Sequence, residues 1–146
     1  MKVFHGRPVV PGQAKAEALV SRDGFNVLAS YQKSLLSGDK DATCSDQNNG
    51  DIYGRPMYGK ALCMPQTIGS TTGGMVLFTA SSLGRQPACL LFSKTIDSLA
   101  AAGAILSDVW TDVSMPTVDG LGDEFLEAVK TGMTVTVEED GTVSVE

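Results

Sequence analysis

A glycine- and hydroxyl-rich turn at residues 69–74 (Gly-Ser-Thr-Thr-Gly-Gly) is the part of the sequence best suited to chemistry. It lies between a short apolar run, Ala61 to Met64, and an apolar segment that begins at Met75. A strand, then this turn, then a helix would bring free backbone N–H groups and the positive end of a helix dipole to one point, which favours an anion. Ser70 would present a hydroxyl there. The alternative is an ordinary helix start, because Ser and Thr are favoured caps.

The other side chains that could take part in a reaction are dispersed along the sequence. A hydrolase triad has little support, because Ser70 lacks a G-x-S-x-G context and the single histidine, His5, lies far away in the sequence. No Lys follows the glycines, which excludes a Walker-type phosphate loop. Asp97, Asp119 and Lys94 stand near the ends of apolar runs, where ligands collect in open α/β sheets. The alternatives for these three are a helix cap, a turn residue and a solvated lysine.

The three cysteines do not have the spacing of metal ligands, so the sequence predicts no metal on this chain. Their odd number and wide spacing fit reduced thiols. Cys63 and Cys89 lie in apolar runs and are expected in the core. Cys44 lies in a polar segment and is expected to be exposed, where a functional role is one interpretation.

The middle of the chain alternates between strand and helix patterns. The predicted order is strand 61–64, helix 73–83 ended by Gly84, strand 88–92, a helix from the N-cap Asp97 to about Val109, and strand 115–118. This order predicts parallel strands with right-handed crossovers. In the second helix Leu99, Ala102, Leu106 and Val109 fall on one face. The small residues on the rest of that helix indicate close packing against a sheet or another backbone.

Both ends of the chain read as β-structure. Residues 14–21 alternate like a half-buried strand, and 27–31 form another short apolar patch. Residues 133–145 predict a hairpin, for which a strict two-residue turn would mix the faces. A three-residue loop at 139–141, with Gly141 left-handed, pairs Val137 with Val143 and Val135 with Val145, so that four valines are buried together.

One long polar segment, residues 37–60, interrupts this pattern. Its central loop from Cys44 to Tyr58 is either functional or a solvated surface excursion.

Composition limits the classes of function. A chain of 146 residues predicts a single domain over 1–146. The net charge of −6, with scattered Lys and Arg, argues against a nucleic-acid partner. No run is long enough for a membrane span, and the first residues have no apolar signal core, so a cytoplasmic location is expected.

Taken in order, these motifs resemble the small subunit of aconitase X. The resemblance covers nearly the whole chain apart from 32–58 and rests on Gly6-Arg7, Ala16 to Ser21, Pro65 to Gly73, Pro87 to Phe92, Asp97 to Ala104, Pro116 to Gly120 and the terminal hairpin. It implies an α/β fold of mixed β/β/α type, similar to the swivelling domain of aconitase-type hydro-lyases. The strand and helix patterns add a βαβαβ middle and a C-terminal β-hairpin.

The resemblance implies a dehydratase in which a separate large subunit carries most of the active site. That subunit would hold an iron or iron–sulfur centre through its own cysteines, and this chain would bind no cofactor. The family's serine falls on Ser70, which would remove a proton from carbon. Gly69, Thr71, Thr72 and Gly73 would contact a small-molecule carboxylate substrate. A helix N-terminus in a water-poor cleft would stabilise the alkoxide, and the partner's metal would accept the leaving hydroxide.

Two departures from the family pattern bear on the substrate. Many members have an arginine immediately before the Gly-Ser pair, where this chain has Ile68. A phosphorylated substrate, such as that of the archaeal phosphomevalonate dehydratases, would benefit from that charge. We therefore expect an unphosphorylated hydroxy acid such as a hydroxyproline, with mevalonate 5-phosphate as the alternative. The Cys44–Tyr58 loop replaces a glycine-rich stretch and is a second place where substrate choice could lie.

A different class of function remains open, a non-catalytic module whose Gly-Ser-Thr-Thr turn holds an anion or serves an interaction. The two hypotheses make different predictions. A dehydratase small subunit needs an exposed apolar face on which its partner docks, with Trp110 and residues 112–115 as candidates. A binding module needs no partner.

Overall fold

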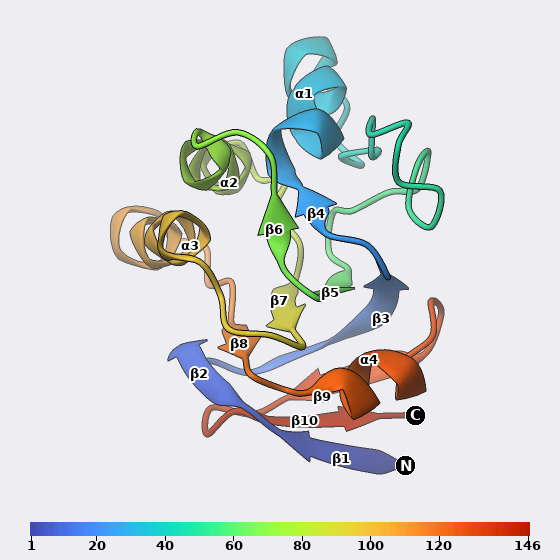
Figure 1. Cartoon of the computed structure of the whole chain (residues 1–146). Helices are drawn as coiled ribbons and strands as arrows, with labels where there is room; N and C mark the ends of the chain where they lie inside the picture. Colours follow the sequence, from blue (N-terminus) through green and yellow to red (C-terminus); the bar gives the residue numbers. More distant parts are fainter.

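An eight-stranded mixed sheet and four helices make up the computed structural model, which describes residues 1–146 (Figure 1). The sheet has the order β1-β10-β9-β3-β5-β7-β8-β2, and β4 and β6 form a separate pair. The strands are β1 (Lys2–His5), β2 (Arg7–Val10), β3 (Ala14–Val20), β4 (Phe25–Asn26), β5 (Ala61–Met64), β6 (Thr67–Ile68), β7 (Cys89–Phe92), β8 (Thr117–Asp119), β9 (Thr134–Val137) and β10 (Thr142–Val145). The helices are α1 (Val27–Ser37), α2 (Gly73–Ser82), α3 (Ser98–Trp110) and α4 (Asp123–Ala128). None of them has the length and hydropathy needed to cross a membrane.

Successive side chains of the parallel strands point to opposite faces of the sheet, and the molecule therefore has three layers. Leu62 and Met64 of β5 pack toward α1, α2 and α3, whereas Ala61 and Cys63 pack toward the antiparallel strands and α4. Both faces of β5 and β7 are therefore buried, as their uninterrupted apolar runs require. Figure 1 shows α1, α2 and α3 above these strands, and the antiparallel strands with α4 below them. The predicted β/β/α arrangement is confirmed.

The βαβαβ middle is also confirmed. Strands β5, β7 and β8 pair in parallel, and β3 adds a further parallel neighbour to β5. Helix α2 ends at Ser82, and Gly84 follows with the left-handed φ of 71° that favours glycine. Asp97 is the N-cap of α3, and its carboxylate accepts the N–H of Ala100 at 2.9 Å.

The C-terminal hairpin has the predicted register. Val143 pairs with Val137 and Val145 with Val135, and all four valines are buried. Gly141 has a φ of 90°, as the three-residue loop requires. Strand β1 pairs with β10, so the two ends of the chain lie side by side.

Two helices were not predicted. The sequence indicated only a short apolar patch at 27–31, but α1 continues to Ser37. Its buried face includes Ser30 and Ser34 beside Val27 and Tyr31, so hydroxyl groups break the apolar stripe that identifies a helix. The six-residue α4 is too short to show a helical period.

Helix α3 has the reverse of the usual amphipathic orientation. Its buried residues are Ala100, Gly103, Ala104 and Ser107, while the large apolar side chains point outward. The predicted close packing is confirmed, because a Cβ on Gly103 would lie 2.4 Å from the carbonyl oxygen of Gly74 in α2. The face of α3 that carries the large apolar side chains therefore does not contribute to the core of this chain.

The Cys44–Tyr58 loop is not a solvated excursion. Cys44, Ile52 and Met57 are fully buried in the core that lies under the helices. Asn49 is also buried, and its side-chain amide donates to the hydroxyl of Ser21 at 2.8 Å. The prediction that Cys44 is exposed was wrong, because the apolar anchors around it are too widely spaced to form a recognisable run.

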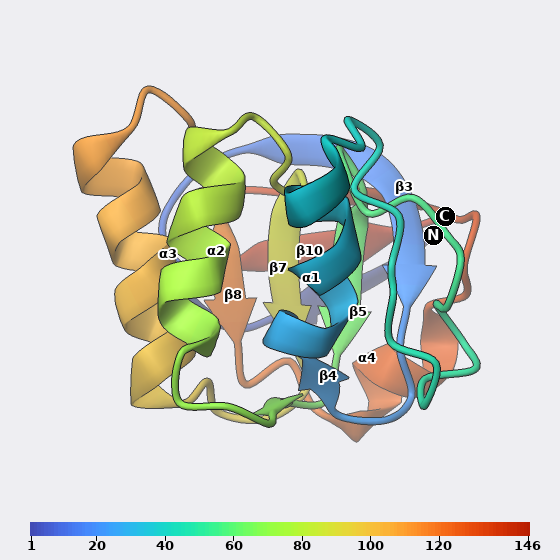
Figure 2. The same cartoon turned by 90° about the horizontal axis from the view of Figure 1, so that it is seen from above.

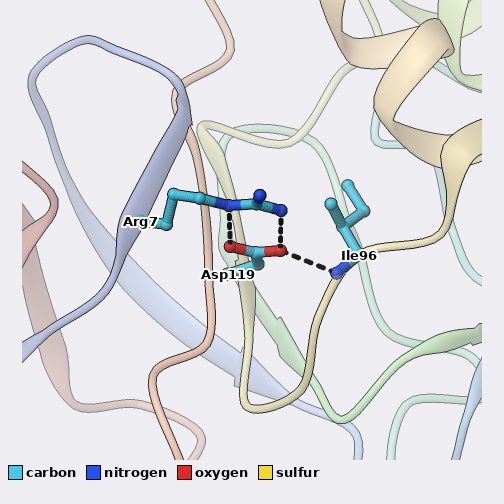
Figure 3. Close-up of polar contacts among 3 residues, drawn as sticks. All are labelled: Arg7, Ile96 and Asp119. Atoms are coloured by element: carbon cyan, nitrogen blue, oxygen red, sulfur yellow. Dashed lines mark hydrogen bonds and ion pairs between the residues drawn. The ribbon is translucent and has the colours of Figure 1, made fainter.

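An ion pair links β8 and β2, the last two strands in the order of the sheet. Arg7 of β2 binds both carboxylate oxygens of Asp119, at 2.9 and 2.7 Å, and the backbone N–H of Ile96 donates to the same carboxylate at 2.8 Å (Figure 3). Asp119 is only 2% exposed. Burial acts to raise its pKa, but the hydrogen bonds from Arg7 and Ile96 outweigh burial and hold the pKa of Asp119 below its usual range.

We predict that Gly103→Ala destabilises the fold, because the new methyl group would meet the rigid backbone of Gly74. The expected loss in free energy of unfolding is about 1–3 kcal/mol, measured by urea denaturation. Gly50→Ala is the matched control, because a Cβ at Gly50 meets nothing within 4 Å. Equal stability of the two variants would contradict the close packing of α2 against α3.

We also predict that Asp119→Asn lowers the free energy of unfolding at pH 7 by about 1–3 kcal/mol. Because the folded pKa of Asp119 lies below the unfolded value, its carboxylate stabilises the fold above about pH 4. That contribution is lost as the pH falls through the folded pKa. The difference between wild type and variant should therefore narrow in acid, whereas the exposed-site control Asp108→Asn should show little difference at any pH. A gap that stays constant down to pH 3 would refute this assignment.

Candidate active site

The Gly-Ser-Thr-Thr turn lies at the edge of the sheet where the parallel strands end. It connects β6 to α2, and Figure 2 shows that α1, α2 and α3 all begin at this edge. A cavity of about 90 Å³ is lined there by Val27, Gly73 and Ala100, one residue from the first turn of each helix. The positive ends of three helix dipoles therefore converge on one small cavity, a setting that favours negative charge.

Ser70 lies exposed at this cavity and is held by its neighbour Thr72. The Ser70 Oγ atom accepts the backbone N–H of Thr72 at 3.2 Å and lies 2.9 Å from the Thr72 hydroxyl. The Ser70 carbonyl oxygen accepts the N–H of Gly73 at 3.2 Å. Thr72 is the N-cap of α2 but makes no side-chain capping bond, because its hydroxyl turns toward Ser70.

Gly69 is required by the geometry of the turn. Its φ is 98°, in the left-handed region, and a Cβ there would lie within 2.7 Å of the Asn26 side chain. Asn26 is the N-cap of α1 and accepts the N–H of Ala29 at 3.1 Å. The close approach of Gly69 thus places Ser70 against the beginning of α1 as well as that of α2.

The wall of this cavity mixes apolar and polar residues and contains no cationic side chain. Asp97 lines it, and its carboxylate is already occupied by the N–H of Ala100 and the hydroxyl of Thr67. No lysine, arginine or histidine belongs to the lining. A cationic side chain that assists Ser70 must therefore come from outside this cavity.

The structure brings some of the predicted site residues together and leaves others apart. Gly69, Ser70 and Gly73 line the cavity, and Thr72 reaches it through its bond to Ser70. Thr71 is exposed and does not line it.

Most of the remaining candidates for chemistry lie outside the Ser70 cavity. Asp119, at the end of β8, is enclosed by Arg7 and Ile96 and does not line the cavity, and Lys94 is exposed outside the cavity lining. His5 lies on the outer strand β1, 3.3 Å from the Thr142 hydroxyl. Of the four other candidates, His5, Lys94, Asp97 and Asp119, only Asp97 therefore lines the cavity.

All three cysteines are buried free thiols. Burial raises the pKa of Cys89 to about 12 and also raises the pKa of Cys63 and Cys44, so each thiol stays protonated at neutral pH. The prediction that Cys63 and Cys89 are core residues is confirmed. No three His, Cys, Asp or Glu side chains group closely enough to hold a metal ion.

Of the two candidates for a docking face, only Trp110 presents a large apolar side chain at the surface. Trp110 is 73% exposed, and its ring packs edge-on against Phe78 with centroids 6.3 Å apart. In the neighbouring segment 112–115 Asp112 and Ser114 are exposed, but Met115 is fully buried, so the prediction was wrong for its apolar side chain. Trp110 belongs to a broader apolar surface, the outer face of α3, of which the sequence analysis named only Trp110.

Sequence comparisons relate the chain to dehydratase subunits. The phosphomevalonate dehydratase small subunit of Thermococcus kodakarensis is 30% identical over 135 residues, which cover 92% of this chain and 89% of that protein. The corresponding subunit of Methanocella arvoryzae is 33% identical over 141 residues, 96% of this chain and 94% of its own. Cis-3-hydroxy-L-proline dehydratase of Pseudomonas aeruginosa is 30% identical over 121 residues, 83% of this chain but 19% of that longer protein.

Solved structures agree with this relationship. The crystal structure of holo aconitase X from Thermococcus kodakaraensis contains a chain that matches with a TM-score of 0.82 and 29% identity, covering 100% of this chain and 99% of that one. A protein of the UPF0107 group, solved by solution NMR, matches with a TM-score of 0.80 and 28% identity over 99% of both chains. The family model described as the aconitase X swivel domain matches residues 3–145. This chain belongs to the aconitase X swivel domain family.

Proposed function

We propose that this chain is the small subunit of an aconitase X-type dehydratase in which Ser70 removes the proton from carbon. Membership in this family, together with relatives named as dehydratases, makes the chain a subunit of a hydro-lyase that works with a large subunit. The position of Ser70, at the cavity where three helices begin, is the observation that carries the assignment of the base.

The bonds at Ser70 suit a serine that acts as an alkoxide. The Thr72 N–H already donates to Ser70 Oγ, and the Thr72 hydroxyl at 2.9 Å supplies a second donor once Ser70 has lost its proton. Two donors and the N-terminus of α2 would stabilise the negative oxygen and so lower the pKa of the hydroxyl. Thr72 is therefore a positioning residue for the base.

Elimination of water also needs a group that receives the leaving hydroxide. An iron or iron–sulfur centre would act as the Lewis acid, and the residues of this chain do not fit such a centre, because its cysteines are buried and no three ligating side chains group together. We place the metal on the large subunit. The task of this chain is then to hold Ser70 and to cover the substrate.

The substrate proposed is an unphosphorylated hydroxy acid such as a hydroxyproline. Ile68, half exposed, precedes the Gly-Ser pair, and no cationic side chain lines the cavity to bind a phosphate group. The names of several relatives favour mevalonate 5-phosphate as the alternative. Assay of the co-produced large and small subunits with both compounds distinguishes them, and turnover of mevalonate 5-phosphate alone would overturn our choice.

We predict that Ser70→Ala lowers kcat of the two-subunit enzyme by about 100-fold or more, because the base is removed, with a smaller effect on KM. Ser82→Ala is the matched control, since it removes an exposed hydroxyl from the far end of the same helix. Steady-state kinetics on both variants measures the difference. Normal turnover by Ser70→Ala would leave this chain as a non-catalytic anion-binding or interaction module.

The outer face of α3 is the surface that we assign to the large subunit. It exposes Leu99, Ile105, Val109 and Trp110, and Met75 of α2 adds to it from the neighbouring helix. An apolar helix face that the chain's own core does not use is typical of a subunit interface. Both helices begin at the Ser70 cavity, so a partner seated here would also reach the cavity.

We predict that Trp110→Glu weakens association with the large subunit at least about tenfold, since an aromatic anchor is replaced by a charge. The fold should be retained, because Trp110 is exposed. Leu36→Glu is the matched control, as Leu36 is 83% exposed on α1. Binding is measured by surface plasmon resonance, and greater damage from the α1 variant would refute the assigned interface.

A further inference from the structure

A second cavity, of about 290 Å³, lies beyond the end of β3 and shares no lining residue with the Ser70 cavity. Three segments that are distant in the sequence meet there. Arg22 follows β3, Asp51 and Arg55 come from the Cys44–Tyr58 loop, and Lys130 and Thr131 form the turn before β9. The folded loop therefore helps to build a cavity that the sequence pattern did not indicate.

The charge of this cavity is opposite to that of the whole chain. Three of its lining side chains are cationic and one, Asp51, is anionic, so three positive charges against one negative leave a local charge of +2. The chain as a whole has a net charge of −6 and only eleven Lys and Arg residues. Cations gathered in one hollow of an acidic protein create a local field that attracts anions.

Arg22 is held in a fixed position by backbone groups. Its guanidinium donates to the carbonyl oxygens of Leu126 and Val129 at the end of α4, the latter at 3.1 Å. Its backbone N–H donates to the Asp51 carboxylate at 2.8 Å, which ties the loop to the end of β3. A guanidinium has five N–H donors, so several remain free after these contacts. Fixing this side chain in advance reduces the entropy lost when it binds a ligand.

The other polar groups of the cavity have donors to spare. The Arg55 side chain makes no hydrogen bond or ion pair, and Lys130 uses one N–H on the carbonyl oxygen of Glu127 at 3.1 Å. Thr131 accepts the Val20 N–H at 3.0 Å, which leaves its own O–H free to donate. A cavity with convergent free donors and a net positive charge has the chemistry of an oxyanion site.

We propose that the cavity lined by Arg22, Arg55, Lys130 and Thr131 binds the oxyanion group, phosphate or carboxylate, of a small molecule. This site does not depend on the assignment of Ser70 as a base. Arg55 and Lys130 are the residues that best test it, because neither is needed to hold Arg22 in place.

The test is an NMR titration of the 15N-labelled chain with inorganic phosphate and, separately, with acetate, at constant ionic strength set by chloride. We expect saturable shifts at residues 20–22, 50–55 and 130–131. Arg55→Gln and Lys130→Gln should each weaken binding by at least about threefold. Lys40→Gln, a charge removal at another exposed site, and Ser70→Ala should leave the affinity unchanged.

Preference for phosphate or for acetate would identify the group that the site takes, and either result supports an oxyanion site. Chemical shifts that grow linearly without saturating, or that chloride alone produces to the same extent, would overturn the proposal. Unchanged affinity in Arg55→Gln would overturn it as well, as would shifts centred on 69–75 that disappear in Ser70→Ala. In that last case the Ser70 cavity is the anion site, so a failure here is distinguishable from a failure of the proposed base.

Discussion

The backbone contact between Gly74 and Gly103 determines how the functional end of this molecule is arranged. Any side chain at Gly103 would meet the Gly74 carbonyl group, so α2 and α3 lie closer together than larger residues would permit. This approach brings the first turn of α2 and the N-cap of α3 to one cavity, which both Ser70 and Asp97 line. In this packing the small residues of α3 face α2, and the large apolar side chains of α3 remain exposed for a partner.

Sequence patterns predicted the parts of the fold whose periodicity is strong and local. The parallel strands β5 and β7 are buried on both faces and therefore read as continuous apolar runs. The hairpin register followed from the requirement that four valines share a face. Asp97 was recognised as an N-cap because capping depends on a residue type at one position. The position of Ser70 at a helix start followed in the same way, while its chemical role came from family resemblance.

The remaining features depend on contacts between distant segments. Helix α1 buries hydroxyl groups, so hydrophobic spacing alone did not reveal it. Cys44 is covered by residues that come from elsewhere in the fold, and its exposure was misjudged from its polar neighbours. The orientation of α3 was ambiguous because both of its faces are free of charge except for Asp108. The cationic cavity joins residues 22, 55 and 130, a grouping that only the folded chain creates.

The pairing of β1 with β10 has an evolutionary consequence. Both termini emerge side by side on the layer opposite the three large helices (Figure 1). A covalent linker added at either terminus would leave the helical layer and its cavity undisturbed. This arrangement is compatible with fusion to a longer polypeptide, and in one longer relative the matching segment occupies 19% of the protein.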